Sequence, residues 1–310
     1  MISSFTDNQM SEKCTVVLPT FFPGEQIVNC IESIPVFFKI LIMDNSYNDS
    51  LTKFIKKFKN VEYYNIGDVG IAKTYNYALN IIKTELIFIS QPDVILRKRC
   101  LENLINSTLS YTSAGFLAPV VFDNGIYSNY DFYDLKYNEV KKIFLNNKIK
   151  KINIVPVGDY SVDAINSTSI LMNTEVIKNL GGWDNNIYTY LEDIDISLRL
   201  KLSGYEIIKV RSAEVDHRGF SSHLLEIKET MNLSRVWHFT WSSIYFKKKF
   251  CNQYVFILSI TKIIFFALAK NIFHLFFFNK KKFIINNIKI SACVSHILNK
   301  GSYFRSKHQV

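Results

Sequence analysis

The sequence predicts an α/β fold followed by a C-terminal helical region. Four runs of strand length, at residues 15–18, 39–43, 61–64 and 86–90, alternate with stretches of helical periodicity. Strands and helices that alternate over short connections imply a right-handed parallel sheet covered by helices on both faces. A change in composition separates the C-terminal region from the α/β part, because the chain contains no acidic residue after Glu229.

Charge is unevenly distributed along the 310 residues, whose formal net charge is +10. Residues 1–229 carry 24 basic and 27 acidic groups, whereas the last 81 residues carry 13 basic groups and no acidic one. We therefore expect an α/β domain over 13–229 and a basic, apolar helical region over 230–310. A basic block of this kind indicates an anionic partner, either nucleic acid or anionic lipid.

The five cysteines are widely spread and include no C-x-x-C pair. This spacing indicates neither a disulfide framework nor a zinc site, and it fits a reducing compartment. The first residues, Met1 to Glu12, are polar and lack the apolar segment of a secretory signal. We therefore expect the α/β domain to lie in the cytosol.

The first two predicted strands end beside polar residues. Pro19 closes the first run, and Thr20 begins the loop that follows it. This loop lacks the G-x-G-x-x-G pattern, so a Rossmann dinucleotide site is not expected there. The second run, 39–43, is followed directly by Asp44 and Asn45.

The third predicted strand leads into a glycine-containing turn. A helix at 50–59, with apolar residues at helical spacing, precedes the strand at 61–64. Two glycines, the second of them Gly70, then free the backbone before a helix that begins near Ile71 and carries Lys73 in its first turn. A helix N-terminus beside a lysine is a good seat for phosphate, but such turns are also common without any ligand.

The fourth predicted strand, 86–90, gives the clearest indication of a ligand or metal site. Its Ile- and Phe-rich run is typical of a strand buried on both faces, and Pro92 ends the pairing because proline has no N–H to donate. Asp93 therefore lies just past the carboxyl end of the strand, where open α/β sheets bind ligands. A carboxylate there suits a ligand or a metal ion, and the alternative is a helix N-cap in a strand-to-helix loop.

The elements after Asp93 are less regular. We expect further elements in this order: a helix at 98–110, strands at 115–121 and 164–172, a short helix ending at Gly181, and a strand at 206–210. Residues 122–157 are polar and aperiodic, and we expect them to form a surface excursion able to cover a bound acceptor.

A helix that begins near Leu191 and ends at Gly204 concentrates acidic residues in its first turn. These are Glu192, Asp193 and Asp195. The helix dipole favours acidic residues at this position, which is the structural explanation. Three crowded carboxylates also repel one another, so the cluster points to a function.

These pieces together resemble a family-2 glycosyltransferase of the GT-A fold, and most closely the bacterial rhamnosyltransferase-type enzymes that build surface polysaccharide. The resemblance spans roughly residues 13–245, and it rests on the order and spacing of motifs that are individually weak. The motifs are Val16-Val17-Leu18-Pro19-Thr20, Met43-Asp44-Asn45-Ser46, Gly70-Ile71-Ala72-Lys73 with Asn76, Gln91-Pro92-Asp93, Gly181-Gly182-Trp183-Asp184, Glu192-Asp193-x-Asp195 with Arg199, and His217-x-x-Gly219-x-Ser221. The resemblance implies a mixed sheet with flanking helices.

The resemblance also implies a donor site for a nucleotide sugar. Asp44 matches the aspartate that binds the nucleotide base, and a carboxylate that accepts a hydrogen bond from N3–H selects uracil or thymine over cytosine. The other donor-binding residues that the match implies are Pro19, Thr20, Asn45, Gly70, Lys73, Asn76, Gln91 and Asp93. The expected donor is therefore a UDP- or dTDP-sugar.

A divalent cation, Mg²⁺ or Mn²⁺, is implied on the donor diphosphate. The Asp-x-Asp motif of the family is matched by Gln91-x-Asp93, so a neutral amide replaces the first carboxylate and we expect a lower affinity for the metal. His217 matches a histidine that approaches the metal or diphosphate in such enzymes. The alternative for a histidine before a glycine-containing loop is a structural role.

Asp193 matches the base of the family, which takes the proton of the acceptor hydroxyl and inverts the anomeric centre. The match implies that Glu192 orients or binds the acceptor, and Trp183 is expected to stack on a sugar face. The predicted reaction moves rhamnose or another hexose from a dTDP- or UDP-sugar to a saccharide or lipid-linked saccharide in surface polysaccharide synthesis. The alternative is a non-catalytic GT-A-fold protein that binds a nucleotide sugar or scaffolds a membrane assembly.

The C-terminal region contains an apolar segment, 254–278, that is about long enough to span a bilayer. Lys262 and Lys270 interrupt it, and lysine triplets at 247–249 and 280–282 flank it. Charges at mid-bilayer are costly, so we favour an amphipathic helix in the interface of an anionic membrane, at the inner face of the cell membrane. The alternatives are a true span, and a helical appendage that packs on the domain or on a second subunit. Nucleic acid is disfavoured because Phe and Ile dominate the region and no nucleic-acid motif accompanies the lysines.

Overall fold

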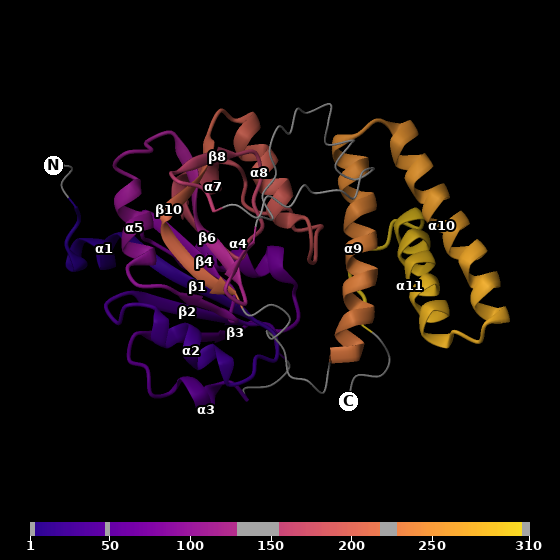
Figure 1. Ribbon diagram of the computed structural model, residues 1–310, viewed down its shortest axis with the longest axis horizontal. Helices are drawn as coiled ribbons and strands as arrows, with labels where there is room; N and C mark the ends of the chain where they lie inside the picture. Colours follow the sequence, from indigo (N-terminus) through magenta and orange to yellow (C-terminus); the bar gives the residue numbers. More distant parts are fainter. Residues whose placement is uncertain (1–3, 47–49, 129–154, 218–227, 306–310) are drawn as a thin grey trace. The chain divides into compact units, whose positions relative to one another are not determined.

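The computed structural model describes residues 4–46, 50–128, 155–217 and 228–305, which form two compact units. The first unit contains the sheet and the helices that cover it (Figure 1). The described part of the second unit consists of the C-terminal helices from Lys228 onward together with a short segment, Asn185–Glu192. That segment lies within the range over which the sequence predicts the α/β domain.

A ten-stranded mixed sheet forms the centre of the first unit (Figure 1). The strand order is β3-β2-β1-β4-β9-β6-β10-β5, with β7 paired to β6 and β8 paired to β10. The strands are β1 (Cys14–Thr20), β2 (Lys39–Asp44), β3 (Val61–Asn65), β4 (Leu86–Ser90), β5 (Val94–Leu96), β6 (Ala114–Asp123), β7 (Ile126–Ser128), β8 (Tyr160–Val162), β9 (Ser169–Asn173) and β10 (Glu206–His217). The first four are parallel, as their alternation with helices predicts, and β9 is antiparallel to both of its neighbours.

Helices cover both faces of this sheet because both faces of its central strands are apolar. Val16 and Leu18 of β1 belong to one buried cluster, and Val17 belongs to the other. The first cluster is covered by α1 (Asp7–Lys13), α2 (Gln26–Ser33), α3 (Thr52–Ile55) and α5 (Cys100–Ser107). The second is covered by α4 (Ile71–Ile81), α7 (Thr174–Asn179) and α8 (Glu192–Leu202).

Strand β10 is longer than the predicted strand at 206–210, and β5 is a strand that the sequence pattern did not predict. The register of β10 against β6 shifts between Val210 and Glu214, after which β10 continues to His217. β5 pairs antiparallel with this second half, so that Val94 lies opposite His217. The pairing brings the end of β10 to the residues that follow β4.

Two of the predicted features fall largely outside the described residues. The surface excursion predicted at 122–157 begins with the end of β6 and with β7, and its residues 129–154 are not described. The loop that follows His217, residues 218–227, is not described either.

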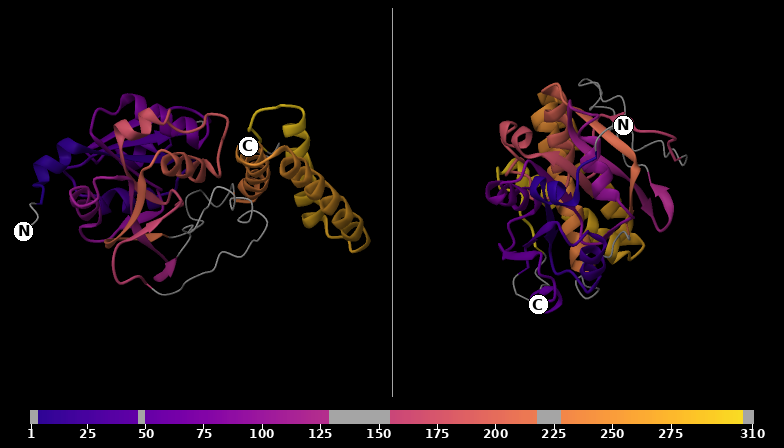
Figure 2. Two further views of the ribbon diagram at one scale, coloured as in Figure 1. Left: turned by 90° about the horizontal axis from the view of Figure 1, so that it is seen from above. Right: turned by 90° about the vertical axis from the view of Figure 1, so that its left-hand side faces the viewer.

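The second unit contains α9 (Lys228–Phe250), α10 (Gln253–Phe276) and α11 (Lys280–Ile297). The three helices lie side by side, with α11 packed on both α9 and α10 (Figure 2). Trp237 and Trp241 of α9 are buried against Ala292 of α11. Asn252 and Asn279 cap the N-termini of α10 and α11 with their side chains. The unit thus has a hydrophobic core of its own.

Candidate functional site

The carboxyl ends of β1, β2 and β4 meet at one edge of the sheet because these strands are parallel and adjacent. Thr20 at the end of β1 lies opposite Asp44 at the end of β2, and Asp93 follows β4 after Pro92. All three polar side chains are at least 96% buried. The sheet therefore gathers at one edge the acidic residues that the sequence predicts for the donor site.

Asp44 is fully buried and is the centre of a hydrogen-bond network. Its Oδ1 accepts hydrogen bonds from Thr20 Oγ1 at 2.9 Å, from Ser46 N at 3.0 Å and from Ser46 Oγ at 2.6 Å. Its Oδ2 accepts one from Tyr63 Oη at 2.9 Å. Each oxygen of an ionised carboxylate has about two acceptor positions, so Oδ2, which accepts one hydrogen bond, is better able to accept another than Oδ1 is.

Asn45 connects the end of β2 to the start of α4. Thr74 donates through Oγ1 to Asn45 Oδ1 at 3.0 Å and to the carbonyl of Gly70 at 2.8 Å. Gly70 has φ +86°, in the left-handed region that favours glycine, and it forms the N-cap of α4. Lys73 is exposed in the first turn. The turn thus presents backbone N–H groups and a lysine, as a phosphate seat requires.

Asn76 holds the loop that carries Trp183. Its side chain accepts from Trp183 N at 2.8 Å and donates to Trp183 O at 2.8 Å. Gly182 lies so close that a Cβ there would be 2.3 Å from Asn76 Oδ1. The Trp183 ring is 4% exposed and packs on Tyr75, with the ring centroids 4.9 Å apart. The sugar-stacking role expected for Trp183 therefore does not fit this placement, and Asn76 is engaged with backbone.

Asp93 lies next to His217, which the pairing of β5 with β10 delivers. His217 Nε2 is 3.7 Å from Asp93 Oδ1, and His217 Nδ1 is 2.7 Å from Asp123 Oδ1. Because an ionised carboxylate can only accept a hydrogen bond, Nδ1 is the donor to Asp123, and Nε2 is the ring nitrogen on the Asp93 side. Histidines that bind metals are commonly oriented by a carboxylate in this way.

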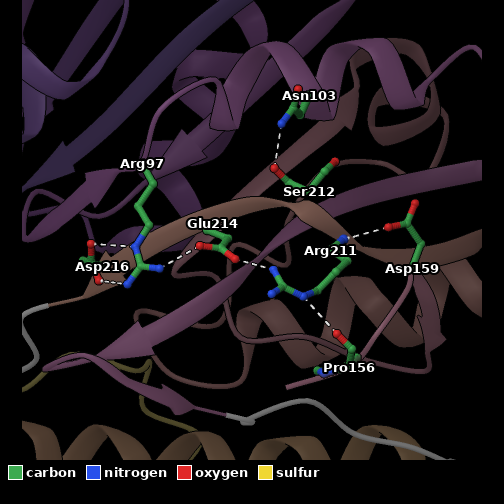
Figure 3. A network of polar contacts seen from close by, with 8 residues as sticks. All are labelled: Arg97, Asn103, Pro156, Asp159, Arg211, Ser212, Glu214 and Asp216. Carbon is green, nitrogen blue, oxygen red and sulfur yellow. Dashed lines mark hydrogen bonds and ion pairs between the residues drawn. The ribbon is translucent and has the colours of Figure 1, made fainter. Parts of the chain in front are cut away.

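Arg97 holds the end of β10 that carries His217 (Figure 3). Its guanidinium donates to both oxygens of Asp216, at 2.9 and 2.7 Å, and to Glu214 at 2.7 Å. It also lies over the ring of Phe122, 4.0 Å from the centroid. Hydrogen bonds to Asp216 and then to Glu214 raise the pKa of Arg97, so the group stays charged. The bidentate Arg97–Asp216 pair is directional and fixes the end of β10.

Asp93 and His217 suit a divalent cation that a diphosphate also binds. Among the described residues, no group of three or more His, Cys, Asp or Glu side chains is arranged to hold a metal ion. Mg²⁺ sites in phosphate-binding enzymes use one or two protein ligands and take the others from phosphate and water. The half-buried Gln91 adds no charge at this position. Asp93 and His217 therefore fit a metal ion that the protein holds weakly and that a diphosphate also binds.

Asp193 lies in the first turn of α8 and is tied to the loop before β9. Ser167 N donates to Asp193 Oδ2 at 3.0 Å, and Ile194 N donates to Oδ1 at 2.8 Å. The next loop residue, Thr168, accepts a hydrogen bond from Gln91 N at 3.0 Å. One hydrogen bond to the Asp193 side chain and one between backbone groups thus connect Asp193, through Ser167 and Thr168, with the Gln91–Asp93 motif. Burial raises the pKa of the Asp193 carboxyl, although the backbone donors at Ser167 and Ile194 act in the opposite direction.

The other two acidic residues of α8 have different surroundings. Asp195 is fully buried and is paired with Arg199 at 2.8 Å, and Arg199 also donates to the carbonyl of Leu180 at 2.8 Å. This pair compensates the charge of Asp195 and joins α8 to the end of α7. Glu192 is 6% exposed and belongs to the second unit. Asp193 and Asp195, which the sequence places close together, thus have separate partners.

Three residues of this site, Tyr63, Arg97 and Asp123, were not predicted from the sequence. A local signal existed for Asp123, because Asn124 and Gly125 form a two-residue hairpin turn with φ +49° and +80°. The turn indicates a strand that ends at Asp123. No comparable local signal marks Tyr63 or Arg97.

Comparisons with known sequences give one family and two relatives. The model described as "Glycosyl transferase family 2" matches residues 15–172. Rhamnosyltransferase WbbL of Escherichia coli is 24% identical over 203 residues, which cover 60% of this chain and 76% of WbbL. Poly(ribitol-phosphate) beta-N-acetylglucosaminyltransferase TarP of Staphylococcus aureus is 29% identical over 108 residues, 31% of this chain and 32% of TarP.

Two solved structures have a similar fold. Mannosyltransferase PcManGT from Pyrobaculum calidifontis, in complex with GDP-Man and Mn²⁺, aligns with a TM-score of 0.51 and 11% identity over 97% of this chain and 91% of its own. GalNAc-T7 with UDP, GalNAc and Mn²⁺ aligns with a TM-score of 0.50 and 15% identity over 67% of this chain. The chain thus spans 44% of the GalNAc-T7 chain. At these identities the similarity concerns the fold.

Proposed function

The chain belongs to glycosyl transferase family 2, and we propose that it is an inverting enzyme that moves a hexose from a UDP- or dTDP-sugar to a saccharide acceptor. It is a glycosyltransferase with the GT-A fold, as its sequence predicts. The observation that carries the proposal is the pair of hydrogen bonds through Ser167 and Thr168 that connects Asp193 to the Gln91–Asp93 motif. Through this connection one unit holds both a general base and a site for the donor diphosphate.

The proposed reaction uses Asp193 as the base. The acceptor hydroxyl oxygen attacks the anomeric carbon while the bond from that carbon to the diphosphate oxygen breaks. The bonding electrons leave with the nucleoside diphosphate, and the acceptor proton passes to Asp193. A raised pKa makes this carboxylate a stronger base than an exposed aspartate.

The leaving diphosphate needs positive charge as it departs. Lys73 and the N–H groups at the start of α4 are suited to bind it. A divalent cation held by Asp93 and His217 would supply further charge stabilisation. The Mn²⁺ in both similar structures supports this assignment.

The two similar structures hold different nucleotides, UDP in GalNAc-T7 and GDP-Man in PcManGT. We therefore argue the identity of the nucleobase in the donor from the surroundings of Asp44. Oδ1 of Asp44 already accepts three hydrogen bonds, and Oδ2 accepts one from Tyr63. Oδ2, which accepts fewer hydrogen bonds than Oδ1, suits the one N3–H of uracil or thymine. Guanine offers two adjacent donors, N1–H and N2–H, which need both oxygens of a carboxylate. This count favours a UDP- or dTDP-sugar, and the similarity to a rhamnosyltransferase supports rhamnose as one candidate sugar.

We also propose that the helical unit binds the surface of an anionic membrane and that the acceptor is a lipid-linked saccharide. Among the described residues, one helix, α10, is long and apolar enough to cross a membrane. One of its faces packs on α11 and α9, and its other face exposes apolar side chains: Tyr254, Ile257, Phe265, Leu268, Ile272, Leu275 and Phe276. Lys262 and Lys270 are exposed as well, which favours a helix in the interface, with lysines reaching lipid phosphates, over a span.

A thermal-shift panel of UDP-, dTDP- and GDP-sugars, each with and without Mn²⁺, tests the donor assignment. A ligand that binds the folded protein raises its melting temperature increasingly as its concentration exceeds Kd. We expect uracil or thymine nucleotides to stabilise the protein, and Mn²⁺ to increase the effect. Stabilisation by GDP-sugars alone would contradict the role of Asp44. Binding without release of nucleoside diphosphate, with or without saccharide acceptors, would instead favour the non-catalytic alternative.

A further inference from the structure

We infer that a bulge in strand β10 places His217 at the proposed metal site, and that Asn103 and Arg97 are positioning residues that hold the bulge and the strand end after it. The inference rests on the proposed function, in which His217 is a ligand of the divalent cation. All of the residues that carry it belong to the unit that contains the sheet. We call residues 211–213 the β10 bulge.

The β10 bulge inserts three residues into the pairing of β10 with β6. Neighbouring residues of β6 lie opposite Val210 and Glu214, which are four positions apart in β10. The register after the bulge is regular, and it ends with His217 opposite Asp123. Without the bulge the same register would place Glu214 opposite Asp123, and His217 would lie beyond the end of β6. The three extra residues therefore decide which side chain of β10 meets Asp123.

The β10 bulge also changes the face of the sheet on which the following side chains lie. Side chains alternate between the two faces, so residues five positions apart lie on opposite faces of a regular strand. Val210 and Val215 are five positions apart, yet both are buried in the first hydrophobic cluster, which α2 and α5 cover. An insertion of three residues, an odd number, accounts for this change. The bulge thus sets both the register and the orientation of residues 214–217.

Hydrogen bonds from two neighbouring segments hold the residues of the bulge (Figure 3). Asn103 of α5 donates through Nδ2 to the carbonyl of Ser212 at 2.6 Å. Arg211 N donates to Asp159 Oδ1 at 2.7 Å, and Arg211 Nε donates to the carbonyl of Pro156 at 2.9 Å. A bulge interrupts the hydrogen bonds of the strand ladder, so these contacts replace pairing that the extra residues lack.

Two arginines hold Glu214, the residue at which the pairing resumes (Figure 3). Arg211 pairs with one carboxylate oxygen of Glu214, and Arg97 donates to the other at 2.7 Å. Arg97 N also donates to the carbonyl of Glu214 at 3.0 Å. The bidentate pair of Arg97 with Asp216 then holds the residue next to His217. Arg97 therefore fixes the strand end through both its backbone and its side chain.

The position of His217 matters because two carboxylates lie on either side of its ring. Nδ1 is 2.7 Å from Asp123 Oδ1, and Nε2 is 3.7 Å from Asp93 Oδ1. A metal-binding histidine depends on such neighbours for its orientation, and losing one typically costs about 10- to 100-fold in metal affinity. A change in the bulge moves His217 relative to both carboxylates, and the affinity for the metal should fall.

Two asparagines of α5 provide a matched test. Asn103 bonds to the bulge, whereas Asn106 accepts a hydrogen bond from Phe5 N at 3.0 Å. Both side chains are half-buried. Asn103→Ala therefore removes a contact with the bulge, and Asn106→Ala removes a similar contact elsewhere on the same helix. Arg97→Lys keeps the positive charge but loses the bidentate geometry toward Asp216.

The full-length variants are compared by calorimetric titration with Mn²⁺ in the presence of UDP, and with UDP in the absence of metal. We expect Asn103→Ala and Arg97→Lys to lower the affinity for Mn²⁺ by about tenfold or more and to leave metal-free binding of UDP unchanged. Asn106→Ala should behave like the wild type in both titrations. In a His217→Ala background, Asn103→Ala and Arg97→Lys should cause little further loss, because they act through His217.

Equal effects of Asn103→Ala and Asn106→Ala on the affinity for Mn²⁺ would overturn the inference. A loss in Arg97→Lys that is equally large in the His217→Ala background would overturn it as well. If the wild type binds neither UDP nor Mn²⁺, the proposed function fails, and the NMR signals of the His217 ring in the unliganded protein decide the inference. These signals are assigned by their absence from His217→Ala. They should shift in Asn103→Ala but not in Asn106→Ala, and equal spectra of these two variants would contradict the role of the bulge.

Discussion

The turn between α10 and α11 is the part of the helical unit best suited to enter a membrane. Phe276, Phe277 and Phe278 are 77%, 66% and 92% exposed, and Phe278 has a φ of +49°. Lys280, Lys281 and Lys282 follow directly and are exposed. Three exposed aromatic rings beside three lysines match the acyl and phosphate layers of an anionic bilayer.

Replacing all three rings, in the variant Phe276→Ser, Phe277→Ser and Phe278→Ser, should weaken binding to anionic vesicles without unfolding the protein. Full burial of one phenylalanine contributes about 1.5–3 kcal/mol. The three rings are on average roughly three-quarters exposed, and insertion at the interface is partial. We therefore expect a loss of about 2–3 kcal/mol, which is roughly 30- to 150-fold in partitioning.

Sedimentation with vesicles of anionic and of neutral lipid, at low and at high salt, measures this partitioning. A control with the substitutions Val36→Ser, Ile126→Ser and Leu202→Ser removes three side chains of the first unit that are 78%, 69% and 62% exposed. The control should bind like the wild type. Equal binding by the phenylalanine variant and the control would refute the assignment of this turn. Point variants are preferable to removing the chain after Tyr245, because that truncation would uncover Trp237 and Trp241.

The remaining predictions concern the site and the helical unit. Asp44→Asn should weaken binding of UDP whether or not Mn²⁺ is present, whereas Asp93→Asn should remove the increment that Mn²⁺ adds; similar losses in both conditions for both variants would contradict this difference. Asp123→Asn should weaken Mn²⁺ binding, measured by calorimetry in the presence of UDP, by about 10- to 100-fold with little change in melting temperature, because His217 loses the carboxylate that orients it. Burial lowers the pKa of His296 to about 4, so the unfolded state binds more protons between about pH 6.5 and 4, and stability should fall by about 2–3 kcal/mol as the pH drops through this range. His296→Leu should flatten that decrease in pH-dependent denaturation, and an unchanged slope would show that other groups cause it.

Local sequence was sufficient to predict that Asp44 and Asp93 lie at one edge of the sheet. Asp44 and Asp93 each follow a short apolar run, and parallel strands place such residues at one edge. The placement of both residues at the same edge of the sheet follows from that regularity. The partners of Asp44 were less predictable, because Tyr63 reaches it from β3, a strand whose polar side chains show no buried pattern.

The proposed metal site was only partly predictable, because long-range pairing brings its residues together. β5 has three residues, too few for any periodicity to be detected, yet its pairing with β10 brings His217 to Asp93. Arg97 holds the same strand end through Glu214 and Asp216, which are more than a hundred positions away in the chain. Contacts at such separations leave no signal in a local window.

The surroundings of Trp183 and of residues 185–192 could not be predicted from local sequence either. Trp183 follows two glycines, and its sequence neighbourhood is equally consistent with an exposed ring and with a buried one. Asn76, from a different helix, turns the loop so that the ring enters the core. Likewise, nothing in residues 185–192 indicates that they pack with α9, because the strained φ of Tyr190 and Leu191 is imposed by tertiary contacts.

The substitution Asp193→Asn tests the proposed role of Asp193 as the catalytic base. Asparagine keeps an oxygen for the N–H groups of Ser167 and Ile194 but cannot take the acceptor proton. Steady-state transfer and donor affinity should be measured together on this variant. We expect a loss in kcat on the order of 10²–10⁴-fold with donor affinity preserved. Near-native turnover, with a decrease in melting temperature instead, would show that Asp193 only stabilises α8 and is not the base.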